Sequence, residues 1–261
     1  MPKLPYLLCP LLLSLAFAAS ATTPTEQRIV AVADAEQLRN IALLQQLVEH
    51  NSGTFNLPGV KAVADLLQPE FAALGFTVTW KPMAQVGRAG HLLASHRGNG
   101  KGKRLLLIGH LDTVFESDNP FTGFRIDGGR AIGPGVGDDK GGVVVMLAAL
   151  RALHAAGALE NADIDVVLTG DEEDVGTPVT IARADLIAAG KRADAALDFE
   201  NISHQNGREM GAVARRSSNE WTLTVHGETG HSAGIFSPAM GDGAAFELAR
   251  ILAAFRSELP E

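Results

Sequence analysis

The stretch RLLLIGHLDT, residues 104–113, opens with a continuous apolar run and closes with a histidine and an aspartate. Four consecutive apolar residues at 105–108 predict a short strand that is covered on both faces. His110 and Asp112 follow this strand two positions apart, so an extended chain would turn both to the same side. A metal-bound imidazole needs a partner for its second ring nitrogen, which Asp112 could provide. Considered alone this signal is weak, because a histidine near a strand end is more often structural or simply exposed.

Helical and strand patterns alternate on both sides of this stretch. Apolar residues at helical spacing predict helices at residues 33–50, 60–74, 141–156 and 178–189. Short apolar or alternating runs predict strands at residues 76–80, 91–95, 104–108, 164–169 and 195–199. Such alternation is typical of an α/β fold with a mostly parallel sheet flanked by helices. Residues 22–31 lack a comparable pattern and are expected to be a mobile N-terminal segment.

The pattern changes near residue 215. Residues 220–226 alternate in polarity and predict a strand, and residues 243–255 predict an amphipathic helix. We therefore expect one α/β domain at residues 22–215 and the beginning of an α+β domain at residues 216–261.

Composition limits the classes of function. Hydrophobic residues make up 46% and charged residues 20% of the 261-residue chain, which is ordinary for a globular protein. The net charge of −8 comes without a basic stripe, so neither a nucleic acid nor an anionic membrane surface is an expected partner.

The first 21 residues have the features of a secretory signal peptide. Lys3 precedes an apolar run at residues 7–18, and small residues follow at a spacing that fits a cleavage site. The run is shorter than the ~20 residues that span a bilayer. The one cysteine, Cys9, lies inside this segment, so the mature chain has no thiol for a disulfide or a metal. We expect a secreted or periplasmic protein.

Three acidic clusters join His110 near the ends of predicted strands, where an open α/β sheet places its ligands. The first is the glycine-rich segment 133–142, which carries Asp138 and Asp139 just before a helix. Either aspartate could simply cap that helix, or one could be a rigid ligand that bridges two metal ions. The glycine spacing fits neither a dinucleotide fingerprint nor a P-loop.

The other two clusters are residues 171–174 (DEED) and 198–201 (DFEN). Four adjacent acids usually lie on a solvated surface, but these directly follow a buried strand. A cation would relieve their repulsion, with one carboxylate as ligand and its neighbour as general base. One histidine among several carboxylates suits zinc held by nitrogen and oxygen. A calcium-stabilised module is the alternative, although His110 would be a poor calcium ligand.

With these motifs in place, the chain resembles the zinc-dependent family that includes glutamate carboxypeptidase, acetylornithine deacetylase, succinyl-diaminopimelate desuccinylase and aminoacylase. The similar stretches follow one another in the family's order and span nearly all of the mature chain: residues 52–54 (SGT), 110–114 (HLDTV), 133–142, 171–173 (DEE), 199–200 (FE), 215–217 (RRS), 221–225 (WTLTV) and 230–232 (GHS). Glutamate at position 200, where other branches have aspartate, is most similar to the glutamate carboxypeptidase branch.

The resemblance implies roles for individual residues. The ligands of two zinc ions would be His110, Asp138, Glu173 and Glu200, with Asp138 bridging the ions. Asp112 would orient His110, Glu172 would be the general base, and His231, in a lid domain that also forms a homodimer, would stabilise the oxyanion. The implied substrate is a small peptide or an N-acyl amino acid.

One feature departs from the family pattern, because no histidine follows His231. In the family a later histidine is the last zinc ligand. We therefore expect a fragment that is unstable or weakly active by itself. A non-catalytic periplasmic binding protein of the same fold is the alternative.

Overall fold

The computed structural model describes residues 22–214 and 221–259. These residues belong to two compact units, Met1–Gly207 and Arg208–Glu261, which are described separately. The predicted signal peptide at residues 1–21 and the motif at 215–217 lie outside the described residues. The predicted domain boundary at 215/216 lies there too, eight residues after the first unit ends.

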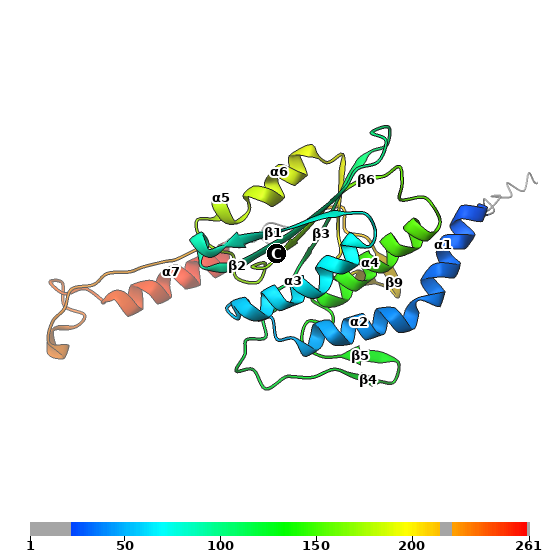
Figure 1. Cartoon of the computed structure of the whole chain (residues 1–261). Coiled ribbons are helices and arrows are strands. Elements are labelled where there is room, and N and C mark those ends of the chain that lie inside the picture. The colour runs from blue at the N-terminus through cyan, green and yellow to red at the C-terminus, as the bar shows by residue number, and fades with distance from the viewer. Residues whose placement is uncertain (1–21, 215–220, 260–261) are drawn as a thin grey trace, which may run out of the picture. The chain divides into compact units, whose positions relative to one another are not determined.

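A five-stranded sheet forms the centre of the first unit (Figure 1). The strand order across the sheet is β1 (Thr77–Met83), β2 (Arg88–His96), β6 (Asp163–Thr169), β3 (Arg104–His110) and β7 (Ala195–Asp198). β3 runs parallel to both of its neighbours, whereas β2 is antiparallel to β1 and β6. Four strands therefore share one direction and β2 opposes them, which confirms the predicted α/β fold with a mostly parallel sheet.

Helices cover both faces of this sheet (Figure 1). One face carries α2 (Gln37–Glu49), α3 (Leu57–Ala72) and α4 (Lys140–Ala155), and the other carries α5 (Val179–Ala182) and α6 (Ala184–Arg192). The remaining elements of this unit are α1 (Pro24–Ala35), η1 (Ala84–Val86), β4 (Arg125–Asp127), β5 (Arg130–Ile132) and β8 (Ser203–Gln205). None of the helices described is long and apolar enough to cross a bilayer.

The apolar run in β3 is covered on both faces, as its sequence predicts. Leu107 joins the large core under α2, α3 and α4, while Leu106 packs with Val167 and Ala189 of α6. Neighbouring side chains of a strand point to opposite faces, so a strand between two helical layers must be apolar at every position.

The prediction of a mobile segment at residues 22–31 was wrong, because α1 begins at Pro24. Thr23 and Glu26 form a capping box, in which the Glu26 amide donates to Oγ1 of Thr23 over 3.2 Å. Pro24 at the first helical position is also a helix-start signal. The helix predicted at 178–189 is divided into α5 and α6 at Arg183.

The second unit contains β9 (Arg208–Met210), η2 (Ser232–Gly234) and α7 (Ala244–Glu258). α7 confirms the helix predicted at 243–255. The strand predicted at 220–226 is absent over its described part, residues 221–226, where Trp221 is 89% exposed. Alternating polarity creates one apolar edge, but a strand also needs a hydrogen-bonded neighbour, and these described residues have none.

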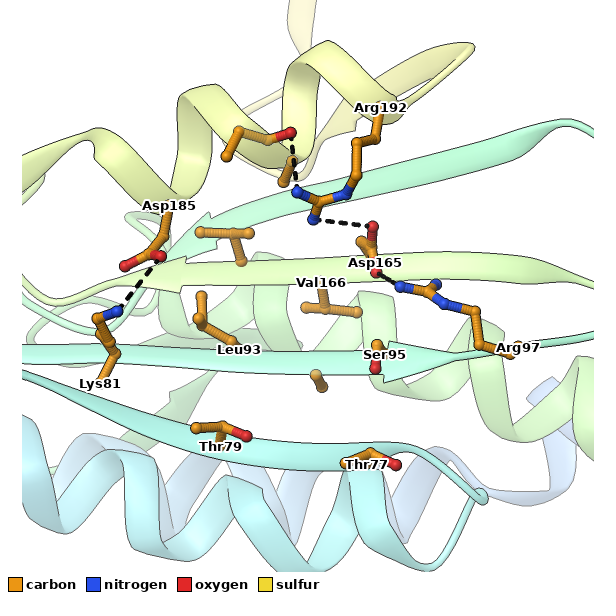
Figure 2. A pocket seen from close by; sticks show the side chains of 14 residues that line it. Thr77, Thr79, Lys81, Leu93, Ser95, Arg97, Asp165, Val166, Asp185 and Arg192 are labelled. Atoms are coloured by element: carbon orange, nitrogen blue, oxygen red, sulfur yellow. Dashed lines mark hydrogen bonds and ion pairs between the residues drawn. The ribbon is translucent and has the colours of Figure 1, made fainter.

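A cavity of about 310 Å³ lies between the outer face of β1, β2 and β6 and helix α6 (Figure 2). Its charged side chains pair with one another, with Lys81 Nζ 3.6 Å from Asp185 and Arg97 2.5 Å from Asp165. Arg192 reaches the second oxygen of Asp165 over 3.4 Å. With its charges already paired, this cavity offers no set of free metal ligands.

Candidate metal centre

The register of the sheet brings the predicted site residues to one edge. His110 ends β3 opposite Thr169, the last residue of β6, and Ile108 lies opposite Asp198 at the end of β7. Glu200 follows Asp198 by two residues, as His110 follows Ile108. The acidic loop 171–174 follows Thr169 directly. Parallel strands thus deliver three separate stretches of sequence to one place.

Two groups of side chains there could each hold a metal ion. One is His110 with Glu172 and Glu200, and the other is His110 with Asp138 and Glu173. Within each group the potential ligand atoms lie within 4.8 Å of one another. The structure therefore brings together all four predicted zinc ligands. It also places Glu172, the predicted general base, within reach of a ligand position.

His110 is buried, and its ring is held from both sides. Nδ1 donates to the backbone carbonyl of Asp112 over 3.0 Å, and Nε2 lies 2.8 Å from Oδ1 of Asp138. A carbonyl can only accept, so Nδ1 carries a proton, and Nε2, which faces Asp138, is the ring nitrogen that a metal ion would bind in place of a proton. That is the arrangement a metal-binding histidine needs.

The centre has an excess of negative charge. Burial lowers the pKa of His110, but the carboxylates of Asp112, Asp139 and Asp138 outweigh burial and raise it to about 10. Burial also raises the pKa of Glu173, as does the charge of Asp138, and the pKa of Glu200 rises by burial and by the charge of Asp198. A bound cation would relieve this repulsion, so the donor set fits a metal ion.

The carboxylate of Asp112 has a wider role than the one predicted. Its Oδ1 lies 3.6 Å from Nδ1 of His110, while the closer acceptor of that ring nitrogen is the Asp112 carbonyl. The carboxylate instead accepts the amides of Glu172 and Glu173 over 3.0 and 3.1 Å. Burial would raise the pKa of Asp112, but the interaction with the His110 ring and the hydrogen bonds from Thr54 and the Glu172 amide hold it below its usual range. Asp112 thus joins the histidine to the acidic loop.

The four adjacent acids of residues 171–174 divide into two pairs. Asp171 is fully buried, where it forms an ion pair with Arg183 and accepts the Gly176 amide over 2.9 Å. Asp174 pairs with Arg88 on β2. These two residues anchor the loop, and only Glu172 and Glu173 contribute to the metal groups. Sequence patterns could not assign the pairs, because Arg88 and Arg183 are distant in the sequence.

His91, which has no predicted role, forms hydrogen bonds to the backbone on both sides of this loop. It is 1% exposed on β2, and its Nδ1 accepts the Gly170 amide over 3.2 Å. Its Nε2 then carries the proton and donates to the Ala182 carbonyl over 2.9 Å. Nothing in the local sequence distinguishes His91 from a surface histidine.

The glycine-rich segment packs tightly behind His110. Asp139 occupies the N-cap position of α4, but its side chain forms no capping hydrogen bond; its Oδ2 accepts the His110 amide over 3.3 Å. Its other oxygen is buried without a partner among the described residues. A Cβ on Gly142 would lie 2.1 Å from that oxygen and 2.0 Å from the Phe199 carbonyl. The helix-capping alternative for the Asp139 side chain is therefore wrong.

A cavity of about 350 Å³ lies beside the metal groups. Glu172, Glu200 and Asp198 line its charged part, and Ile108, Val175 and Leu186 line its apolar part. Polar groups at one end of an apolar pocket are typical of sites for small molecules.

His231 belongs to the second unit. It is exposed at the N-cap of η2, where its Nδ1 accepts the Ala233 amide over 3.1 Å. Its contact with a substrate stays a prediction.

A family model describes most of this arrangement. The model of the peptidase family M20/M25/M40 matches residues 106–250. The match includes all the predicted zinc ligands together with Glu172, Asp112 and His231.

Individual proteins of known function are also similar to this chain. Carboxypeptidase G2 of Pseudomonas sp. (strain RS-16) is 36% identical over 170 residues, which cover 64% of this chain and 40% of the relative. The succinyl-diaminopimelate desuccinylase of Rhodospirillum centenum is 35% identical over 202 residues, covering 74% and 51%. The chain thus spans about half the length of the relatives it matches.

Solved structures share the fold. Human carnosine dipeptidase 1 has a TM-score of 0.57 at 18% identity, covering 68% of this chain and 41% of that one. A metallo-carboxypeptidase from Sulfolobus solfataricus has a TM-score of 0.53 at 20% identity, covering 65% and 39%.

Proposed function

This chain belongs to the peptidase family M20/M25/M40, and on that premise we propose that its carboxylate cluster binds zinc and hydrolyses an amide bond. The proposal rests above all on one observation. Two groups of potential ligand atoms share the buried His110, and burial together with neighbouring carboxylates raises the pKa values of Glu173 and Glu200.

We assign the ligands of two zinc ions to His110, Asp138, Glu173 and Glu200. Imidazole nitrogen with carboxylate oxygen is a donor set that zinc accepts, whereas calcium prefers oxygen alone. Nε2 of His110 lies 2.8 Å from Oδ1 of Asp138, which supports these two residues as ligands of the same ion. Zinc, when bound, supplies Lewis-acid activation of water and of the substrate carbonyl.

Glu172 is the general base in this proposal. Its side chain is exposed beside the ligand groups, and its backbone is fixed by the hydrogen bond to Asp112. It takes the proton from the attacking water and gives it to the leaving amine. Glu173, the next residue, points its carboxylate to the metal groups, so two adjacent acids have different tasks.

The proposed substrate is a small peptide or an N-acyl amino acid. The names of the relatives, a carboxypeptidase and a desuccinylase, support this class. The cavity of about 350 Å³ beside Glu172 and Glu200 suits a small molecule better than a folded protein.

We also propose that the chain is exported and that its second unit acts as a lid over the metal centre. For export, the charged start, apolar run and small residues of positions 1–21 support a secreted or periplasmic location. His231, in the segment 230–232, would stabilise the oxyanion, and the unit would form a homodimer. Intact mass of the protein purified from the periplasm tests cleavage, and sedimentation tests the dimer.

Zinc per chain is the test of the central proposal. Elemental mass spectrometry on protein purified without chelator should give at least one zinc ion per chain, and zinc should bind in preference to calcium. A panel of dipeptides and N-acyl amino acids should then show zinc-dependent release of an amino acid. A chain that binds no zinc, or prefers calcium, would contradict the proposal.

A further inference from the structure

Thr54 lies in the loop between α2 and α3, far in sequence from the metal centre. Its side chain is 2% exposed, and Oγ1 lies 2.7 Å from Oδ2 of Asp112. The threonine hydroxyl donates to this carboxylate oxygen, which also accepts the Glu173 amide. Hydrogen bonds to charged groups are shorter and stronger than neutral ones.

The same carboxylate orders the acidic loop. Oδ2 of Asp112 accepts both the Thr54 hydroxyl and the Glu173 amide, and Oδ1 accepts the Glu172 amide. The direction in which the carboxylate plane faces therefore determines where these two amides can bind. Only one of its three donors, Thr54, comes from outside the acidic loop.

The segment that carries Thr54 is held firmly against the centre. Gly53 forms a parallel β-bridge with Thr113, whose amide donates to the Ser52 carbonyl over 2.9 Å. A Cβ on Gly53 would lie 2.6 Å from Glu116, so the approach leaves no space for a side chain. These contacts thus fix the backbone that carries Thr54 beside Asp112.

A second anchor lies at the end of α2. The buried Lys140, next to the glycine-rich segment, donates from Nζ to the His50 carbonyl over 2.9 Å. Asn51 donates to the Phe115 carbonyl, also over 2.9 Å. The segment between α2 and α3 is therefore tied to both loops that follow β3 and precede α4.

We propose that Thr54 is a positioning residue of the metal centre. Its hydroxyl sets the orientation of the Asp112 carboxylate, and Asp112 in turn holds the amides of Glu172 and Glu173. Thr54 touches neither metal nor substrate in this role. The claim that Thr54 orders the acidic loop does not depend on the proposed function. The consequence for hydrolysis rests on the proposed function.

Two substitutions separate the hydroxyl from the bulk of the side chain. Thr54→Val keeps the volume and removes the donor, while Thr54→Ser keeps the donor and removes a methyl group. Ser52→Ala is the matched control, because the Ser52 hydroxyl is equally buried, two residues away, and has no hydrogen-bond partner among the described residues.

Two readouts follow on the full chain. In Thr54→Val, amide hydrogen exchange measured residue by residue should become about tenfold faster at Glu172 and Glu173. Zinc affinity, measured by competition with a chromophoric chelator, should fall about tenfold, as it does for other residues that contact a metal ligand. Thr54→Ser should behave as the parent, and so should Ser52→Ala.

Equal effects of Thr54→Val and Thr54→Ser would overturn the proposal, since packing and not the hydroxyl would then matter. Unchanged exchange at both amides in Thr54→Val would overturn it as well. Hydrogen exchange is measured on the metal-free chain, so a parent that fails to bind zinc would refute the proposed function and still test the role of Thr54.

Discussion

The backbone amide of Glu172 donates to Oδ1 of Asp112 over 3.0 Å. This bond connects the loop after β6 to the loop after β3, which also carries His110. The proposed general base and the proposed metal ligand are thus oriented through one buried carboxylate.

Glu172→Gln should abolish most turnover and leave zinc binding intact. The amide side chain keeps the size of Glu172 but cannot accept a proton, and general bases contribute about 10²–10⁴-fold to rates. Turnover and zinc per chain are measured on the same preparation. Glu160→Gln, an exposed change in the turn that precedes β6 and so near the opposite end of that strand, is the control. Loss of one zinc ion from Glu172→Gln would instead make Glu172 a ligand, because it also lies in a potential metal group.

His110→Ala should weaken zinc binding at one position, because Nε2 is the one ring nitrogen that the Asp112 carbonyl leaves free to bind an ion. We expect a loss of more than about 100-fold in affinity, beyond the 10–100-fold typical of outer-sphere changes. Isothermal titration with zinc measures it. His154→Ala, on the exposed side of α4, should bind zinc as the parent does. Unchanged zinc affinity in His110→Ala would show that His110 is not a ligand.

Arg183→Ala should destabilise the first unit by about 3–5 kcal/mol, because it leaves the fully buried Asp171 without a counter-charge. Urea unfolding followed by circular dichroism measures the change. Arg39→Ala is the matched control, since Arg39 is half-exposed and pairs with Glu36 and Glu70 at the surface. It should cost less than about 1 kcal/mol. Equal costs would mean that the Arg183–Asp171 pair contributes no more than a surface pair.

Gly142→Ala should be destabilising although alanine favours helices. The new Cβ would meet the Phe199 carbonyl at 2.0 Å and Asp139 at 2.1 Å, and overpacking of this kind costs about 1–3 kcal/mol. Gly190→Ala in α6 meets no atom within 4 Å and should stabilise the chain by up to about 1 kcal/mol. Thermal unfolding of both variants tests the contrast, and a stabilised Gly142→Ala would contradict the packing described behind His110.

The outline of the fold was predictable because it depends on local pattern. The apolar run at 105–108 needed two helical layers, and the alternating helices on either side supplied them. The site followed from the same reasoning, since parallel strands end at one edge and carry His110, Glu173 and Glu200 to it. Prediction was wrong at residues 22–31, where the capping signal of Thr23 and Glu26 was overlooked. It was also wrong at residues 221–226, where alternation was not matched by a partner strand.

By itself, the sequence determined the order of strands and helices, the residue types at each strand end and the membership of a metallopeptidase family. These properties depend on hydrophobic period and on motifs of neighbouring residues. Tertiary structure alone decided which acid has which task. Asp171 and Asp174 became anchors because Arg183 and Arg88 arrive from other elements, and Asp112 became the link to Glu172. A carboxylate acquires its role from the charges and donors that folding brings beside it, and these partners lie up to 86 residues away along the chain.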